Sequence, residues 1–347
     1  MTFSIGELAI GAGSVTVIAE AGVNHNGSLD EAKSLALSAK ECGAGIVKFQ
    51  TYKSEKLSSP RAEKFWEKEH DLSVYQEETY SILDGFEEAD YFHLKQFCDS
   101  IGIEFLSTPF DLDAVDMLCR IGVNGFKIAS CDITNFSLIE KVAKTKLPIF
   151  LSTGASTLGE IEEAVNFISE FHRNLSLMHC VLSYPTANAD ANILSVDVLA
   201  KKYPNLVIGY SDHTREIYSA LGSVALGSRV IEKHFTLARD DSKPGDHWFA
   251  VVPEDMKLLV EGSNAILQAL GKHSKDVLDC ELKAREQARR SIYLANSVSK
   301  GQLATKDDFI MLRPGTGLEP KVLDLLIGKR FVREMDKLAQ VSISDLE

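Results

Sequence analysis

The sequence predicts an α/β protein: a (β/α)8 TIM barrel followed by a small C-terminal β-rich domain. Eight short β-rich runs alternate with amphipathic helical patterns before residue 240, as in a barrel of parallel strands that takes about 250 residues. The chain has 347 residues, more than the roughly 100–200 of one domain. Composition also changes after Gly271, where charged residues crowd a short stretch and the elements become shorter.

The expected strands are short runs rich in β-branched and other apolar residues. They cover Val15–Ala21, Ile46–Gln50, Ile103–Thr108, Gly125–Ala129, Ile149–Ser152, Ser176–Val181, Leu206–Tyr210 and Val230–Phe235. Residues 29–42 and 157–171 place their apolar side chains on one helical face. Gly43, Gly102 and Gly122 follow helical patterns as C-terminal caps do, and Pro253 is placed to open a last long helix.

One interval breaks the regular spacing. Residues 51–90, which follow the second strand, include Trp66 and His70 in a charged segment. An insertion after a barrel strand lies on the active-site face. We therefore expect this segment to form a lid.

The predicted domains are a barrel over 1–271, a linker over 272–289 and a β-rich domain over 290–347. Ten of the nineteen residues 272–290 are charged, which predicts an exposed linker helix. The last segment has turns at 300–301 and 313–317. About sixty residues make a marginal domain, so docking on the barrel or on a partner chain would stabilise it.

Charge and composition exclude several classes of protein. The chain has 37 basic and 50 acidic residues and a net charge of −13, which disfavours nucleic acid and anionic membranes as partners. No apolar run reaches the roughly 18 residues of a membrane span, and Met1–Gly13 lacks the features of a signal peptide. Six scattered cysteines without a CxxC motif predict reduced thiols in a cytoplasmic protein.

In a barrel, the carboxyl ends of the strands converge on one site. Here they bring two lysines, Lys48 and Lys127, and four hydroxyl side chains, Thr108, Ser130, Ser152 and Ser211. A phosphoryl or carboxylate group needs such positive charge and hydrogen-bond donors. A single Ser or Thr after a strand is more often a helix N-cap, but a lysine inside an apolar run is costly to bury without a partner.

Two histidines, His213 and His234, end neighbouring predicted strands. They are either hydrogen-bonded core residues or ligands of one divalent ion that keeps positions open for water and substrate. Mn²⁺ suits such a site, with Mg²⁺ and Co²⁺ as alternatives, and a structural zinc site lacks further ligands. His25, His179 and His247 are spare candidates, with His179 more typical of a core residue.

Nine motifs in order resemble the sialic acid (nonulosonate) synthase family across nearly the whole chain. They are Ile18–Gly27, Val47–Thr51, Leu106–Phe110, Phe126–Ser130, Leu151–Gly154, His179–Cys180 with Tyr184–Thr186, Gly209–Thr214, Ile231–Thr236 and Leu312–Gly317. The family joins a TIM barrel to a SAF domain, which is similar to type III antifreeze protein.

The resemblance implies condensation of phosphoenolpyruvate with an N-acyl hexosamine aldehyde, N-acetylmannosamine or a related sugar, to a nine-carbon 3-deoxy-2-keto acid and phosphate. It assigns phosphoenolpyruvate to Lys48, Thr108, Lys127, Ser130, Ser152 and Ser211, and the metal to His213 and His234. It places Glu20, Gln50, Tyr184 and Asp246 around the sugar and the metal-bound water. Arg313 matches an arginine that one subunit inserts into the other's barrel, which predicts a domain-swapped homodimer.

The mechanism expected from this resemblance has the metal polarise the aldehyde while C3 of phosphoenolpyruvate attacks it. Water then adds at C2, with Glu20 as the residue that orients or deprotonates it, and phosphate leaves by C–O cleavage. Lys48 and Lys127 stabilise the anionic groups.

Two departures from the family pattern lie near the sugar. Leu182 stands where some members have asparagine, and Ala250 stands where many have serine. The acceptor therefore stays open among N-acetylmannosamine, its 6-phosphate, mannose derivatives and the precursors of legionaminate or pseudaminate.

Other classes of function remain alternatives. A Schiff-base aldolase acting on a keto sugar acid would use Lys127 or Lys233, but it would leave the histidines and hydroxyls without a task. A tail that binds ice or a glycan is disfavoured by its linkage to a fully furnished barrel.

Overall fold

A computed structural model describes residues 2–11, 13–66 and 73–347. The chain divides into two compact units, Met1–Gly271 and Lys272–Glu347. Each unit has its own buried apolar core. His70, named above in the expected lid, lies outside the described residues.

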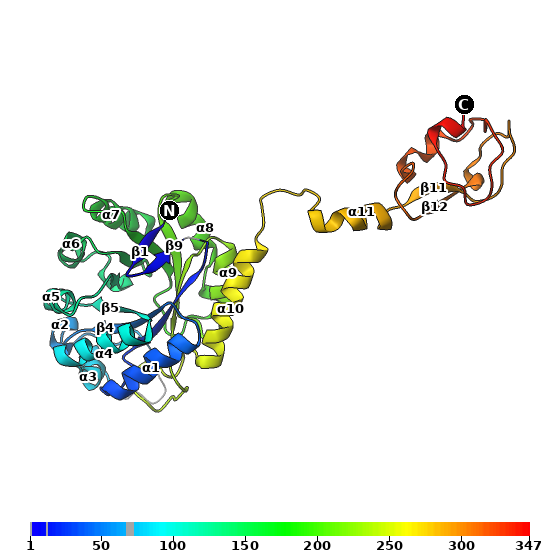
Figure 1. The fold of residues 1–347 in the computed structure, drawn as a ribbon. Helices are drawn as coiled ribbons and strands as arrows, with labels where there is room; N and C mark the ends of the chain where they lie inside the picture. Colours follow the sequence, from blue (N-terminus) through cyan, green and yellow to red (C-terminus); the bar gives the residue numbers. More distant parts are fainter. Residues whose placement is uncertain (1, 12, 67–72) are drawn as a thin grey trace. The chain divides into compact units, whose positions relative to one another are not determined.

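The first unit is built on eight parallel strands (Figure 1). They are β3 (Thr16–Gly22), β4 (Ile46–Thr51), β5 (Glu104–Pro109), β6 (Phe126–Ile128), β7 (Ile149–Ser152), β8 (Leu175–Cys180), β9 (Val207–Asp212) and β10 (Val230–His234). Hydrogen bonds join them in the order β5-β4-β3-β10-β9-β8-β7-β6, and the two end strands, β5 and β6, lie next to each other. The predicted barrel fold is confirmed, and each strand overlaps an expected run.

Helices alternate with these strands and surround them (Figure 1). They are α1 (Leu29–Glu41), α4 (Glu88–Ile101), α5 (Leu112–Ile121), α6 (Phe136–Lys144), α7 (Leu158–Ser169), α8 (Leu194–Lys202), α9 (Tyr218–Ala225) and α10 (Pro253–Ala269). Gly102 and Gly122 end α4 and α5 in the left-handed conformation, and Pro253 opens α10, as predicted. No described helix has the length and apolar character that a membrane span requires.

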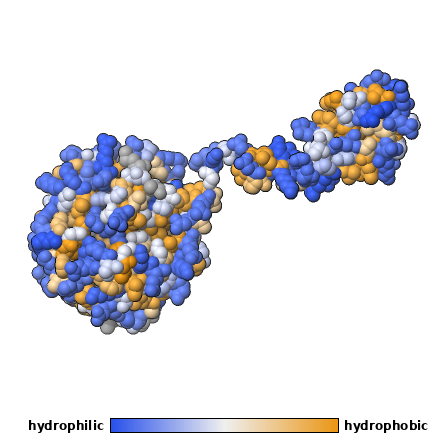
Figure 2. Space-filling view, in the orientation of Figure 1, coloured by the Kyte–Doolittle hydropathy of each residue, from blue (hydrophilic) through white to orange (hydrophobic). Residues whose placement is uncertain are grey.

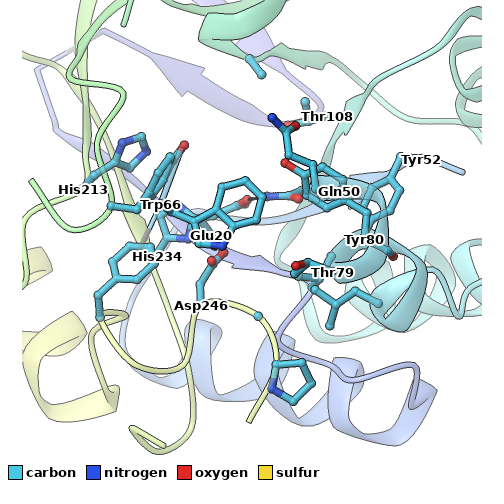
Figure 3. A pocket seen from close by; sticks show the side chains of 18 of the residues that line it. Glu20, Gln50, Tyr52, Trp66, Thr79, Tyr80, Thr108, His213, His234 and Asp246 are labelled. Atoms are coloured by element: carbon cyan, nitrogen blue, oxygen red, sulfur yellow. Dashed lines mark hydrogen bonds and ion pairs between the residues drawn. The ribbon is translucent and has the colours of Figure 1, made fainter. Parts of the chain in front are cut away.

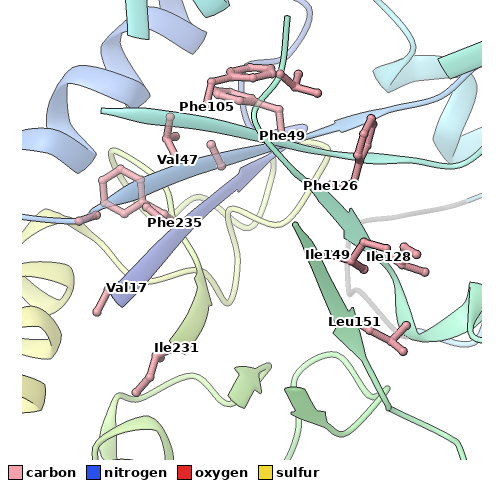
Figure 4. Close-up of a cluster of buried hydrophobic side chains, with 14 of the residues drawn as sticks. Val17, Val47, Phe49, Phe105, Phe126, Ile128, Ile149, Leu151, Ile231 and Phe235 are labelled. Atoms are coloured by element: carbon pink, nitrogen blue, oxygen red, sulfur yellow. The ribbon is translucent and has the colours of Figure 1, made fainter. Parts of the chain in front are cut away.

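Strand side chains alternate between two apolar layers. Outward-facing residues such as Val17, Val47 and Ile231 pack in the layer between strands and helices (Figure 4). Inward-facing neighbours such as Ile18 and Ile46 form a separate inner cluster. Because side chains alternate along a strand, the polar residues two positions further along these strands also point inward.

A hairpin at the N-terminus was not expected. It joins β1 (Phe3–Ile5) to β2 (Leu8–Ile10) through Gly6, whose φ of 54° favours glycine. Its residues Ile5 and Ile10 join the inner cluster with the early residues of the barrel strands. The hairpin therefore covers the barrel end opposite the carboxyl ends of the strands.

Two short helices and a short antiparallel bridge occupy the interval after β4. They are α2 (Ser54–Leu57), α3 (Gln76–Leu83) and the bridge between Glu63 and Tyr75. Lys53 fastens this segment, since its ammonium lies 3.1 Å from Asp84 and 2.9 Å from Glu87.

The second unit is small and β-rich. The strands β11 (Ser291–Leu294) and β12 (Phe309–Leu312) pair antiparallel beside α11 (Leu282–Ala288), and Ile292, Leu294 and Phe331 contribute to a common core. Short 3-10 helices complete the chain: Ser130–Asp132 and Asn188–Asp190 in the barrel, and Asp279–Glu281, Lys306–Asp308, Pro320–Leu325 and Ile343–Asp345 after it.

The expectation of one continuous linker helix was wrong. Residues 272–278 are not helical, and α11 has only seven residues. Residues 272–278 contain Ser274 and Asp276, which favour turns over helix interiors, and the charges of this stretch only indicate exposure. Val277 and Leu278, which precede α11, and Leu282, its first residue, are exposed, and Figure 2 shows a hydrophobic patch there.

Candidate active site

A cavity of about 650 Å³ opens at the carboxyl ends of the barrel strands. The predicted barrel residues all line it: Glu20, Lys48, Gln50, Thr108, Lys127, Ser130, Ser152, Tyr184, Ser211, His213, His234 and Asp246. Ten labelled residues of this cavity are seen in Figure 3. Its position on the barrel is the one at which TIM-barrel enzymes place their catalytic groups.

Lys48 is held at the floor of the cavity by a carboxylate on the adjacent strand. Its ammonium lies 2.6 Å from Glu20 Oε2 and donates to Thr108 Oγ1 at 3.1 Å. Gln50 donates to the other oxygen of Glu20 at 2.9 Å. The parallel register of β3 and β4 pairs Glu20 with Lys48, so the two charges neutralise each other in a buried place.

Lys127 shares a second carboxylate, that of Glu232. The Lys127 ammonium lies 3.3 Å from Glu232 Oε1, and Ser211 donates to the same oxygen at 3.1 Å. Burial alone would raise the pKa of Glu232, but Lys127 and Lys48 outweigh it and lower this pKa to about 2. The carboxylate therefore stays charged at neutral pH.

Glu232, which stands with Lys233 and His234 at the end of the eighth predicted strand, is a central residue of the site for which no role was predicted. The signal was present, because Glu232 stands two residues before His234 on the same strand. Side chains two apart face the same side of a strand. A lysine-rich barrel interior also requires carboxylates to balance it.

Two serines differ in how they are bonded. Ser130 Oγ accepts a hydrogen bond from the Gly154 backbone at 2.8 Å, and Gly154 leaves no room for a side chain there, since a Cβ would lie 2.9 Å from that oxygen. Ser152 Oγ is buried and has no hydrogen-bond partner among the described residues. A buried hydroxyl that lines a cavity and lacks a partner fits an oxygen-rich ligand.

His213 and His234 lie together on one side of the cavity (Figure 3), with ring centroids 5.3 Å apart. His213 Nδ1 lies 2.8 Å from the Val181 carbonyl oxygen. A carbonyl only accepts, so the proton of the neutral ring is on Nδ1 and Nε2 keeps its lone pair. Burial, followed by the charge of His234, lowers the pKa of His213 to about 3, so this ring is neutral at pH 7.

Asp246 completes this side of the cavity. Its Oδ2 lies 3.0 Å from His234 Nδ1. Burial alone would raise the pKa of Asp246, but the neighbouring His234 lowers it below its usual range. A carboxylate behind an imidazole is the usual support of a histidine that binds a metal.

These donors fit a divalent ion with an open coordination sphere. The described residues contain no group of three or more His, Cys, Asp and Glu side chains suited to a metal. Two imidazoles with a nearby carboxylate would leave the remaining positions to water and substrate, as catalytic sites require.

Of the spare histidines, none lines the cavity. His179 bonds the Ala191 carbonyl oxygen at 3.0 Å and stacks on Tyr210. His25 packs on Phe86, and His247 lies 2.7 Å from Thr236 Oγ1. They are structural residues.

An aromatic wall faces the histidines and was missed as a feature of the site. We use "aromatic wall" for Tyr52, Phe65, Trp66, Tyr80 and Phe110, all of which line the cavity. In the view of Figure 3, Trp66 lies between the histidine side and Tyr52 and Tyr80. Most of the wall comes from the interval after β4, so the segment expected as a lid does border the cavity.

The residues that depart from the family pattern occupy different places. Leu182 lines the cavity, which adds an apolar surface beside Tyr184. Ala250 is fully buried outside the cavity lining, and its carbonyl accepts from Arg239 at 3.0 Å.

Two further candidates lie outside the cavity lining. Lys233 alternates with Glu232 and His234 and bonds Asp212 on the outer side of the strand, so of the two aldolase lysines only Lys127 reaches the cavity. Arg313 is exposed on a turn of the second unit, and its role in a partner's barrel stays a prediction.

Comparisons with known proteins identify the family to which both parts of the chain are similar. The model of the NeuB family matches residues 35–275, and that of the SAF domain matches residues 289–347. An N,N'-diacetyllegionaminic acid synthase of Legionella pneumophila is 40% identical over 322 residues, 90% of this chain and 89% of that protein. The human N-acetylneuraminate-9-phosphate synthase is 31% identical over 317 residues, 90% of this chain and 88% of that protein.

A solved structure of a sialic acid synthetase is also similar to this chain. The N-acetylneuraminic acid (sialic acid) synthetase of Leptospira borgpetersenii, in complex with citrate, superposes with a TM-score of 0.73 at 33% identity. The match covers 82% of this chain and 95% of that one.

Proposed function

Since the chain belongs to the NeuB family of sialic acid and related nonulosonic acid synthases and ends in a SAF domain, we propose that it condenses phosphoenolpyruvate with an N-acylated hexosamine aldehyde. The products would be a nine-carbon 3-deoxy-2-keto sugar acid and phosphate. The family resemblance seen in the sequence is confirmed, and the choice of substrates is the proposal.

The observation that carries this proposal is the pair of buried ammonium groups at the cavity floor. Lys48 and Lys127 both lie within 3.8 Å of Glu232, and Ser152 offers a hydroxyl to which no described residue bonds. An anion with several oxygens satisfies such a cluster. Phosphoenolpyruvate carries a phosphate and a carboxylate and would use Thr108, Ser130 and Ser211 as further donors.

His213 and His234 would hold the metal, for which we propose Mn²⁺. A divalent ion bound there supplies Lewis acidity toward a carbonyl oxygen. The chain itself keeps the His213 ring neutral by burial and orients the two rings through Val181 and Asp246.

In the proposed reaction, the C2–C3 double bond of phosphoenolpyruvate supplies the electron pair for the new bond between C3 and the aldehyde carbon. Water adds to C2, and the resulting tetrahedral intermediate expels phosphate as its C–O bond breaks. Glu20 would orient this water or take its proton, since its carboxylate is held by Lys48 and Gln50. The two lysines balance the negative charge throughout.

The lining of the cavity favours an uncharged acceptor. Its described residues include three lysines, Lys48, Lys127 and Lys243, against five carboxylates: Glu20, Glu78, Glu232, Asp241 and Asp246. A phosphorylated sugar would add negative charge to an acidic surface. The aromatic wall and Leu182 instead suit acyl methyl groups and a deoxy carbon.

The test measures phosphate release from phosphoenolpyruvate with Mn²⁺ and three acceptors: N-acetylmannosamine, its 6-phosphate and a 2,4-diacetamido-2,4,6-trideoxy hexose. We expect turnover with an uncharged acceptor and a lower kcat/KM for the phosphate. No release with any of them would contradict the proposal. A substrate–lysine adduct trapped by borohydride would favour the aldolase, with Lys127 as its nucleophile.

We also propose that two copies assemble so that Arg313 of one chain reaches the cavity of the other. The acidic cavity and the exposed arginine have complementary charge. A hydroxyl-rich acceptor between them would gain a further charged hydrogen-bond donor from Arg313.

A further inference from the structure

A buried ion pair stands in the apolar layer outside the barrel strands. Lys233 and Asp212 are each 1% exposed, and Lys233 Nζ lies 2.8 Å from Asp212 Oδ2. The neighbours of Lys233 on this face of β10, Ile231 and Phe235, belong to the apolar core. The pair therefore faces away from the cavity, and the proposed chemistry gives it no task.

The hydrogen bonds of this pair all lead to the segment that carries His213. Asp212 Oδ1 accepts from the Thr214 backbone at 2.9 Å and from the Tyr210 hydroxyl at 3.1 Å. Lys233 Nζ also donates to the Thr214 carbonyl oxygen and, at 3.2 Å, to Thr214 Oγ1. Lys233 thus bonds to both residues that flank His213, Asp212 and Thr214.

The two charged residues directly precede the two histidines. Asp212 ends β9 and is followed by His213, while Lys233 is followed by His234. The parallel register pairs Lys233 with Asp212. The rings themselves are oriented by separate partners, Val181 for His213 and Asp246 for His234, so the ion pair links the two backbone segments directly.

We propose that the Lys233–Asp212 pair is a positioning pair, which fixes the separation of His213 and His234 and thereby the affinity of the site for a divalent ion. This inference rests on the proposed function, because it takes the two histidines as metal ligands. The pair touches neither substrate nor metal and acts only through the backbone of its neighbours.

Stability alone does not account for the pair. A buried ion pair is often no more stabilising than well-packed apolar residues of similar volume, because both charges lose their hydration. The six directed hydrogen bonds of the pair, including one from Thr214 Oγ1 to Asp212 Oδ2 at 3.0 Å, by contrast define one arrangement of the two strand ends. The role of the pair is therefore to fix the geometry of the two strand ends. An apolar replacement should keep the fold but hold His213 and His234 less rigidly in place.

The test compares the full-length protein with the double variant Lys233→Met/Asp212→Leu, each freed of metal by chelator and titrated with Co²⁺. The readouts are the visible Co²⁺ spectrum, the Kd for Co²⁺ and the melting temperature. We expect a folded variant whose Kd rises by about 10- to 100-fold, the range found when supports of metal ligands are removed, with a changed spectrum.

The matched control is Lys95→Met/Asp99→Leu, which removes an ion pair on α4 whose lysine is also buried. Its Co²⁺ affinity should equal that of the wild type. If the Lys233/Asp212 variant does not fold, Asp212→Asn replaces it, since the amide retains an oxygen for the Tyr210 and Thr214 bonds while removing the charge. That variant should weaken Co²⁺ binding by at least about threefold, a smaller effect than loss of the whole support.

Unchanged Co²⁺ affinity and spectrum in a folded variant at Lys233 or Asp212 would overturn the inference while leaving the proposed function intact. If the proposed metal site itself is absent, the Co²⁺ titration gives a different result. The wild type would then bind no Co²⁺, or a His213→Ala protein would bind it as tightly as the wild type, and the positioning role would fall with it.

Discussion

The carboxylate of Glu232 lies 3.3 Å from the ammonium of Lys127, on the floor of the cavity. The same oxygen lies 3.8 Å from Lys48. One acidic side chain thus balances both cations, and its removal leaves two positive charges with only Glu20 beside them.

Glu232→Gln should lower the stability of the barrel by about 3–5 kcal/mol, the usual cost of removing one partner from a buried ion pair. Phosphoenolpyruvate should raise the melting temperature of this variant more than that of the wild type, because its anionic groups replace the lost charge. Fluorescence melts report on the barrel, since both tryptophans, Trp66 and Trp248, belong to it. A variant as stable as the wild type would contradict the role of Glu232.

Ser152→Ala should weaken phosphoenolpyruvate binding without destabilising the protein. Its hydroxyl has no partner among the described residues, so the folded protein loses no hydrogen bond. The ligand loses a bond to a charged group, worth about 1.5–3 kcal/mol, and its KM should rise by roughly 10- to 100-fold. Steady-state kinetics and thermal melts measure the two effects.

Ser176→Ala is the matched control for this experiment. Ser176 Oγ is also buried and has no hydrogen-bond partner in the described part of the chain, but the residue does not line the cavity. Its KM for phosphoenolpyruvate should be unchanged. Equal KM values for the two alanine variants would remove Ser152 from the substrate site.

His213→Ala should abolish the metal-dependent part of the activity. We expect a loss greater than the roughly 100-fold that removal of a ligand's support alone can cost. The variant should still fold, because the ring lies on the cavity surface and its main packing partner is Tyr184. Phosphate release with and without chelator provides the measurement, and full activity in the chelator-treated variant would exclude His213 as a ligand.

Acid should weaken the barrel partly through His25. Burial lowers the pKa of His25 from 6.5 to about 4, against the opposing charge of Asp90. The unfolded chain therefore takes up a proton first as the pH falls, and stability that is complete above pH 6.5 is lost down to pH 4. The full difference amounts to about 3 kcal/mol.

His25→Gln should flatten this dependence between pH 6.5 and 4, while an amide oxygen can still accept from the Gly27 backbone. Urea unfolding at several pH values, followed by tryptophan fluorescence, measures the slope. The carboxylates are the same in both proteins. Identical slopes of unfolding free energy against pH would therefore show that His25 does not contribute to the loss of stability in acid.

Arg313 should act on the neighbouring subunit. Mixing Arg313→Ala with His213→Ala, each inactive alone, should restore activity after subunit exchange, because hybrid dimers contain one cavity with both intact residues. The mixture should regain about one working site per hybrid dimer. If exchange is demonstrated by labelled subunits and no activity returns, Arg313 does not act in trans.

Much of the barrel could be predicted because strand positions have a strong local signal. The run Ile149–Ser152 was predicted to the residue, and the end residues Lys48 and Lys127 line the cavity as expected. Convergence follows from topology alone, since parallel strands in a barrel bring their carboxyl ends together.

The errors have separate physical causes. The hairpin around Gly6 had a signal in the alternation of Phe3, Ile5, Leu8 and Ile10, which a search for parallel strands passes over. The aromatic wall was not predictable as a surface, because Phe65 and Trp66 come from a segment without strand or helix periodicity. Lys233 and Glu232 could be distinguished only by fixing which face of β10 points inward.

The alternation along β10 limits how this chain can vary in length. Adding or deleting one residue within Val230–His234 would turn Lys233 toward the cavity and send His234 into the apolar layer, because a shift of one residue exchanges the faces of a strand. A protein with such a change would lose both His234 and Glu232 from the cavity in one step. The exposed residues 272–278 carry no such constraint, so insertions and deletions among descendants should collect there and be absent from β10.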